Sequence, residues 1–288
     1  KEAYGASLRF KLTNAQKRCI KEIEKDVCSG RVMNRLLQGD VGSGKTAVAF
    51  YALLLSVYNG GQAALMAPTE VLARQHFHDF TAQFPQISAA LLCGSTKKSE
   101  KERIKSALKD GSIKVLIGTH AIIQEDVSLP LCKLIVTDEQ HRFGVAHRAL
   151  LGAKSEGVHT LVMSATPIPR TLSLVLYSDL DFSVLDEMPP GRQKISTHII
   201  PPQKEQAMYE YIAQCALKGK QSYIVCPVIE ESDSLPVMSA EELYIKLSEG
   251  YLKNISVGLL HGKMSVKDKN AVIEKFSSGE IKELVSTT

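Results

Sequence analysis

Short apolar runs alternate with stretches of helical period over the first 165 residues, and this alternation constrains the fold more than any other feature. The runs are RLLQG at 35–39, AALMAP at 63–68, AALLCG at 89–94, KVLIGT at 114–119, KLIVTD at 133–138 and TLVMSA at 160–165. Apolar runs of strand length separated by helices are typical of a parallel sheet with helices on both faces. The pattern therefore predicts an α/β lobe.

A second lobe follows a break in this pattern. Two prolines and a glycine in DEMPPGR, residues 186–192, indicate a linker. Beyond it the pattern predicts strands at ISTHII, SYIVCPVI, ISVGLL and ELVST, with helices over about 203–217, from about 239, and over about 266–276. We therefore expect two α/β lobes, 1–188 and 189–288. Because the chain stops within a strand, we expect the second lobe to be incomplete at its C-terminus.

Composition narrows the class of protein without assigning a function. With 288 residues, 44% of them hydrophobic, the chain is long enough for two domains. A formal net charge of +4 permits a polyanionic partner but does not require one. The six cysteines form no CxxC pair and lie mostly in apolar runs, so we expect buried free thiols in a reducing, cytoplasmic compartment. The longest apolar stretch, 47–58, is too short to span a bilayer, and we expect no membrane partner.

The segment GDVGSGKT, residues 39–46, matches the phosphate-loop pattern G-x-x-x-x-G-K-[ST] between a predicted strand and a predicted helix. Its glycines allow backbone N–H groups to surround phosphate oxygens, and the helix N-terminus adds a partial positive charge. Lys45 would reach the β- and γ-phosphates, and the Thr46 hydroxyl would ligate Mg²⁺. The residues predicted to bind a nucleoside triphosphate are Gly39, Asp40, Val41, Gly42, Ser43, Gly44, Lys45 and Thr46.

Two adjacent carboxylates, Asp138 and Glu139, follow the apolar run KLIV. Hydrolysis of a magnesium-bound triphosphate needs one carboxylate for the metal and a base for the attacking water. Consecutive residues leaving a strand point in different directions, so we assign Asp138 to Mg²⁺ and Glu139 to the water. The alternative is a loop with two solvated acids, which a phosphate loop in the same lobe disfavours. The acidic pair in turn favours a hydrolase over a mere binder or a kinase.

Several longer strings occur in order along nearly the whole chain: LLQGDVGSGKT, ALMAPTEVLARQH, IGTHAIIQ, DEQHRFGV, SATPIPRTL, DEMPPGR, CPVIEES and LLHGKM. These strings resemble superfamily 2 helicases, and most closely the RecG family of branched-DNA helicases. The resemblance implies tandem RecA-like lobes and a motor that acts as a monomer. It also implies ATP and Mg²⁺ as cofactors, with branched and duplex DNA as partners in recombination and repair.

Two other functions stay open at this point. The transcription-repair coupling translocases share several of the same strings, although Gln140, PPGR and VIEES favour the RecG family. A protein of another class, a nucleotide-switched module that holds DNA without moving, would also need the phosphate loop. DNA affinity that depends on ATP without turnover would distinguish that module.

The resemblance further assigns roles to single residues. It implies that Gln16 in LTNAQKR recognises adenine, but Thr13-x-x-Gln16 is also a helix capping box, and both functions can hold. His141 would couple the γ-phosphate site to the second lobe, unless it is an ordinary surface histidine. The residues implied to link hydrolysis to DNA movement are Ser164, Thr166 and Arg170, in a string whose prolines could otherwise start a helix.

Contacts to the nucleic-acid backbone are also implied by the resemblance, and such contacts need only hydroxyls, amides and N–H groups. The residues so assigned are Thr69, Gln75, Thr119 and His120 in the first lobe, and His261 and Thr287 in the second. The alternative for the first-lobe residues is that they are helix N-caps and ordinary surface residues. In the family an arginine finger follows the last motif present and a wedge domain precedes the first. We therefore expect this chain to bind nucleotide yet hydrolyse ATP weakly or not at all.

Overall fold

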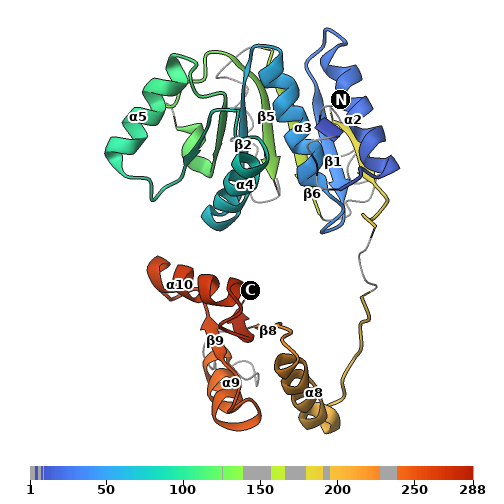
Figure 1. Cartoon of the computed structure of the whole chain (residues 1–288), viewed down its shortest axis with the longest axis vertical. Coiled ribbons are helices and arrows are strands. Elements are labelled where there is room, and N and C mark those ends of the chain that lie inside the picture. The colour runs from blue at the N-terminus through green and yellow to red at the C-terminus, as the bar shows by residue number, and fades with distance from the viewer. Residues whose placement is uncertain are drawn as a thin grey trace. The chain divides into compact units, whose positions relative to one another are not determined.

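The computed structural model describes residues 4, 5, 8, 10–124, 126–138, 157–165, 180–190, 195–227 and 239–287. The chain divides into two compact units, Lys1–Gln193 (unit 1) and Lys194–Thr288 (unit 2). Each unit has its own parallel sheet (Figure 1). The predicted α/β class with parallel sheets is therefore confirmed.

Unit 1 contains a seven-stranded sheet in the order β3-β4-β2-β5-β6-β1-β7. The strands are β1 (Asn34–Gly39), β2 (Gln62–Met66), β3 (Ala89–Leu92), β4 (Val115–Gly118), β5 (Cys132–Asp138), β6 (His159–Ser164) and β7 (Asp181–Leu185). The helices are α2 (Asn14–Val27), α3 (Lys45–Tyr58), α4 (Glu70–Gln83), α5 (Lys98–Lys109) and the short 3₁₀ helix η1 (His120–Ile123). Figure 1 shows α2 and α5 at opposite ends of this sheet.

Apolar side chains cover both faces of the sheet in unit 1. On one face Leu37 and Val136 pack with α3, where Phe50 is almost fully buried. On the other face Leu116 packs with Leu108 of α5. A strand that is buried on both faces has no polar side to present, which explains why the sequence shows continuous apolar runs instead of alternation.

The strand β7 was not among the predicted strands. It pairs in parallel with β1, whose other neighbour is β6. Only part of β7 is buried: Ser183 and Leu185 face inward, while Asp181 and Val184 are exposed. Because β7 is an edge strand, its sequence lacks the continuous apolar run by which the central strands were recognised.

Unit 2 contains a three-stranded parallel sheet in the order β8-β10-β9. Its strands are β8 (Ser222–Cys226), β9 (Val257–Leu260) and β10 (Glu283–Thr287), and its helices are η3 (Pro202–Lys204), α8 (Glu205–Leu217), α9 (Ala240–Lys246), η4 (Leu247–Tyr251) and α10 (Val266–Ser277). The prediction of a strand at 195–200 is wrong. This segment is extended, but it pairs with no strand in the described part of the chain, and Ile199 is 98% exposed. A β-branched composition favours extended backbone but cannot supply a partner strand.

All six cysteines are free thiols, as predicted. Cys19, Cys93, Cys132 and Cys226 are buried, whereas Cys28 at the end of α2 is exposed, against the expectation of burial. None of the described helices is both long enough and apolar enough to cross a membrane.

Candidate nucleotide-binding site

The carboxyl ends of the strands in unit 1 meet at one edge of the sheet, because all the strands run in parallel. Gln38 of β1 lies beside Ser164 of β6, and Asp138 of β5 lies beside Met163 of β6. Asp138 is therefore two strands from β1, roughly 10 Å across the sheet at the usual strand spacing. Open parallel sheets bind their ligands at this edge, so the fold brings the predicted metal carboxylate to the phosphate loop.

The predicted phosphate loop connects β1 to α3. Gly42 and Gly44 have φ angles of 81° and 87°, in the left-handed region that favours glycine. Gly44 is also the N-cap residue of α3, and no side chain among the described residues caps that terminus. A Cβ on Gly44 would lie only 2.2 Å from Nε2 of Gln16. The loop therefore requires glycine here and presents an uncapped helix N-terminus, which is suited to an anion.

The side chains of the loop fit a polyphosphate. Lys45 Nζ donates to the carbonyl oxygens of Gly39 (2.7 Å) and Asp40 (3.1 Å). The Ser43 hydroxyl is buried and has no hydrogen-bond partner within the described residues. Phosphate oxygens would offer Lys45 a charge-assisted bond in place of bonds to neutral carbonyls.

Gln16 joins α2 to the phosphate loop. Its Oε1 accepts a hydrogen bond from Thr13 N (3.0 Å), and the Thr13 hydroxyl accepts from Gln16 N (3.2 Å), so the predicted capping box is confirmed. Its Nε2 donates to the Ser43 carbonyl (2.9 Å), and the side chain is fully buried. Adenine recognition by Gln16 stays a prediction.

The predicted metal ligand Asp138 has a partner that sequence reasoning missed. His76 of α4 places Nε2 3.1 Å from Asp138 Oδ2, and the two side chains are only 8% and 13% exposed. The inward face of α4 carries Ala73, His76 and Phe80, spaced three and four residues apart. That helical spacing could have marked His76 as inward-facing, but no local pattern indicates its contact with Asp138.

Phe10 was also missed. This aromatic side chain is 47% exposed and lines a hollow of about 600 Å³ together with Gly44, Thr46 and Phe50. The signal available in the sequence was an aromatic residue three positions before the capping box that starts at Thr13. The hollow adjoins the start of α3, so the surface beside the phosphate loop has an apolar wall.

The residues predicted to contact DNA in unit 1 differ in accessibility. Thr69 caps α4, because its hydroxyl accepts a hydrogen bond from Leu72 N (3.3 Å). A helix N-cap was the alternative to a DNA contact that the sequence left open for this residue. Gln75 and His120 are exposed. Thr119 is 5% exposed, and its hydroxyl has no hydrogen-bond partner in the described ranges. Gln75 and His120 therefore present side chains to solvent, whereas Thr119 does not.

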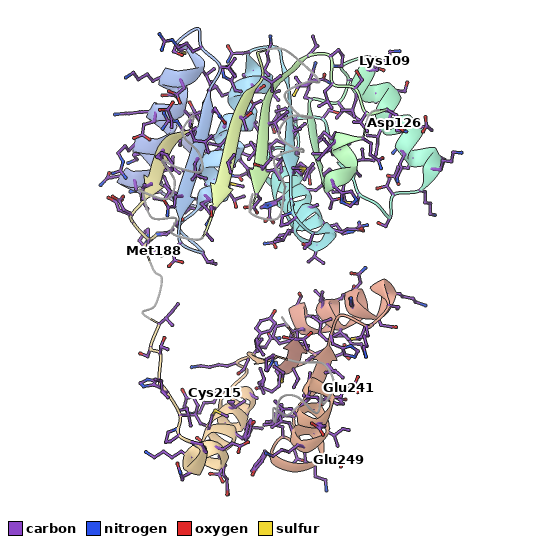
Figure 2. All side chains as sticks on the ribbon, turned by 180° about the vertical axis from the view of Figure 1, so that it is seen from behind. Lys109, Asp126, Met188, Cys215, Glu241 and Glu249 are labelled. Carbon is purple, nitrogen blue, oxygen red and sulfur yellow. The ribbon has the colours of Figure 1, made fainter. Side chains whose placement is uncertain are left out.

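In unit 2, His261 and Thr287 both lie at carboxyl ends of parallel strands. His261 follows β9, and its Nε2 is 3.7 Å from Glu241 Oε1 on α9 (Figure 2 labels Glu241). Its Nδ1 is buried and unpartnered among the residues that the structure describes. Thr287 is the half-buried last residue of β10.

Four predicted residues, Glu139, His141, Thr166 and Arg170, lie outside the described residues. Ser164 ends β6 and is 3% exposed. The described side chains include no group of three or more His, Cys, Asp or Glu residues that could hold a metal ion. A Mg²⁺ site of one hydroxyl and one carboxylate, completed by phosphate oxygens and water, needs no such group.

Comparison with known proteins identifies the family. The DEAD/DEAH box helicase family matches residues 13–175, and the helicase conserved C-terminal domain matches 203–288. The ATP-dependent DNA helicase RecG of Thermotoga maritima is 50% identical over 289 residues, covering 100% of this chain and 37% of the relative. RecG of Bacillus subtilis is 45% identical over 284 residues, covering 98% of this chain and 42% of the relative.

A solved structure of RecG bound to a three-way DNA junction superposes with a TM-score of 0.82 at 46% identity, covering 100% of this chain and 37% of that one. The predicted resemblance to RecG helicases and the tandem RecA-like fold are confirmed. The chain spans about two fifths of the length of the RecG relatives that it matches. The chain therefore belongs to the DEAD/DEAH box helicase family, as a relative of the RecG helicases.

Proposed function

We propose that this chain is the ATP-hydrolysing core of a RecG-like helicase that moves on duplex DNA and remodels branched structures such as replication forks and Holliday junctions. The observation that carries the proposal is the convergence, at one edge of one sheet, of the phosphate loop and the largely buried carboxylate Asp138. The RecG relatives and the RecG structure bound to a three-way junction support the choice of DNA substrate.

The residues of unit 1 would hold Mg-ATP in the following way. Lys45 exchanges its two carbonyl contacts for β- and γ-phosphate oxygens, and Gln16 keeps the loop in place through Ser43. The Thr46 hydroxyl and one Asp138 oxygen hold Mg²⁺, while Glu139 orients and deprotonates the attacking water. When bound, Mg²⁺ neutralises charge on the transferred phosphoryl group.

DNA would be held through its phosphate backbone. Gln75 and His120 are the exposed candidates in unit 1, and Thr69 is half-buried at the start of α4. In unit 2 the candidates are His261 and Thr287. The free thiols of the chain support a reducing, cytoplasmic location for the same protein.

Two substitutions in the full-length protein test this function. Lys45→Ala should weaken ATP binding by roughly tenfold or more, because it removes charge-assisted hydrogen bonds to phosphate. Glu139→Gln should retain ATP binding and lose turnover, since Glu139 acts on the water and not on the bound phosphates. Lys25→Ala, at an exposed position near the end of α2, is the matched control.

ATP turnover is measured with three-way junction, linear duplex and single-stranded DNA, together with nucleotide affinity. The proposal expects turnover that DNA stimulates, most strongly with the junction. Turnover that no DNA changes would contradict a motor function, and normal turnover in Glu139→Gln would remove that residue from its assigned role.

A further inference from the structure

The contact between His76 and Asp138 joins α4 to the end of β5. The proposed function assigns DNA contacts to α4 and a metal ligand to β5. The imidazole Nε2 lies 3.1 Å from Asp138 Oδ2, in a setting where both side chains are largely buried. A carboxylate that ligates a metal is normally oriented by a second partner on its other oxygen. With Oδ2 engaged by His76, Asp138 retains Oδ1 for a single bond to a metal ion.

The position of His76 is itself fixed by packing. Its ring meets the ring of Phe50 edge-on, at 6.5 Å between centroids and an interplanar angle of 76°. Phe50 belongs to α3, the helix that begins at the phosphate loop. Phe80, one helical turn after His76, is fully buried and packs edge-on against the ring of Phe50. His76 therefore sits where α3, α4 and the end of β5 meet, and it has little freedom to reorient.

The opposite face of α4 is directed to solvent. Gln75 is exposed and His76 is buried, as expected for consecutive helical residues that point about 100° apart. Thr69 caps the start of the helix, and Glu70 pairs with Arg74 at 2.6 Å. Because α4 is one continuous helix of 14 residues, a displacement of its outer face would displace His76 as well.

We propose that His76 is a positioning residue that orients Asp138 for the metal and transmits DNA engagement on α4 to the nucleotide site. This inference rests on the proposed function, because it takes Asp138 as the Mg²⁺ ligand and α4 as a DNA-facing helix. Phosphate contacts at Thr69 and Gln75 would set the position of α4, and His76 would convert that position into the orientation of the carboxylate.

The test uses the full-length helicase with three substitutions at position 76. His76→Leu fills the space without a donor, and His76→Asn keeps a polar group too short to reach Asp138. His76→Gln places an amide nitrogen near the position of Nε2 and should restore the contact. Phe77→Leu is the matched control, since Phe77 is the half-buried next residue on α4 and packs against the apolar core of unit 1.

Two measurements separate a positioning role from a general packing role. The first is the Mg²⁺ concentration at which the Mg²⁺-dependent gain in binding of a fluorescent ADP analogue is half complete. The affinity of the protein for the same analogue without Mg²⁺ serves as the reference. Loss of a partner to a metal ligand typically costs about 10–100-fold in metal affinity, so His76→Leu and His76→Asn should raise that concentration about tenfold or more. Affinity without Mg²⁺ should stay unchanged, and His76→Gln should recover most of the loss.

The second measurement is the ratio of ATP turnover with and without three-way junction DNA. His76→Leu and His76→Asn should lower this ratio severalfold while nucleotide-free DNA affinity stays at the wild-type value. The proposal is overturned if the folded variants keep the wild-type Mg²⁺ requirement and the wild-type ratio, or if Phe77→Leu shows equal losses. Absence of Mg²⁺-dependent binding or DNA stimulation in the wild type would instead overturn the proposed function, and this inference with it.

Discussion

Single buried polar residues connect the elements of the proposed nucleotide site. The side-chain amide of Gln16 makes two hydrogen bonds. Its oxygen accepts from Thr13 N, the N-cap of its own helix, and its nitrogen donates to a phosphate-loop carbonyl 27 residues away. Its carbonyl partner, Ser43, carries a buried hydroxyl that has no bond within the described residues. A buried polar group that loses its partner costs more than the bond itself contributes. We therefore expect the shape of the phosphate loop to depend on Gln16.

This dual bonding predicts different consequences for the two residues of the capping box. Gln16→Ala should lower the free energy of unfolding by about 1–3 kcal/mol, because Thr13 N and the Ser43 carbonyl lose a partner. It should also weaken nucleotide binding. Thr13→Ala should cost about 1 kcal/mol as the loss of a helix cap, with nucleotide affinity unchanged. Urea unfolding and calorimetric titration with ATP measure both effects, and equal loss of affinity in the two variants would refute the distinction.

Elements differ in how they accommodate a buried charge, as two strands show. Arg35 of β1 donates to Asp26 of α2 (2.6 Å) and to the Ser183 hydroxyl of β7 (2.9 Å), so one guanidinium bonds β1 to both α2 and β7. Glu283 begins the central strand of unit 2 and is fully buried. Burial raises the pKa of Glu283 to about 7, and the adjacent Ser222 hydroxyl offsets this only in part.

The raised pKa of Glu283 predicts that unit 2 loses stability as the pH rises. In the unfolded chain a glutamate titrates near 4.3, so the favourable neutral form is fully present below about pH 4.3 and is lost as the pH passes through about 7. Glu283→Gln should therefore raise the free energy of unfolding by about 1–3 kcal/mol at pH 8, with a smaller gain at pH 5.

Chemical unfolding of the 288-residue chain, followed by circular dichroism at both pH values, measures this gain. Glu249→Gln is the matched control, since Glu249 is exposed on η4 (Figure 2). A gain for Glu283→Gln that is the same at pH 5 and pH 8 would show that ionisation of Glu283 is not the cause.

At the scale of the whole molecule, the proposed motor needs both parallel-sheet units. In each unit the proposed binding residues lie at the carboxyl ends of the strands: Asp138 and the phosphate loop in unit 1, His261 and Thr287 in unit 2. The amino-terminal end of α2 is also tied to the segment after β7, since Ala15 N donates to Glu187 Oε2 at 3.1 Å. The helix that carries Gln16 is therefore bonded to the start of the predicted linker.

The proposed contacts to DNA phosphates predict a strong salt dependence of DNA binding by the full-length protein. Each neutralised duplex phosphate should contribute a slope of about −0.9 to log K against log salt concentration. Affinity should vary little with base sequence, because phosphate contacts do not read bases. Fluorescence anisotropy with labelled junctions of differing sequence at several salt concentrations measures both. A base-specific, salt-insensitive affinity would indicate a regulator that recognises a particular site.

Local sequence patterns were sufficient to predict the phosphate loop, the capping box and the central strands of unit 1. Each depends on neighbours in the chain: glycine conformations, a hydroxyl three residues before an amide, or an apolar run that is buried on both faces. Only the tertiary structure could show that β7 completes the sheet, that 195–200 pairs with no described strand, and that Thr119 is buried. The contact of His76 with Asp138, 62 residues away, follows from α4 packing against the end of β5. That proximity depends on the order of strands in the sheet, which no local periodicity encodes.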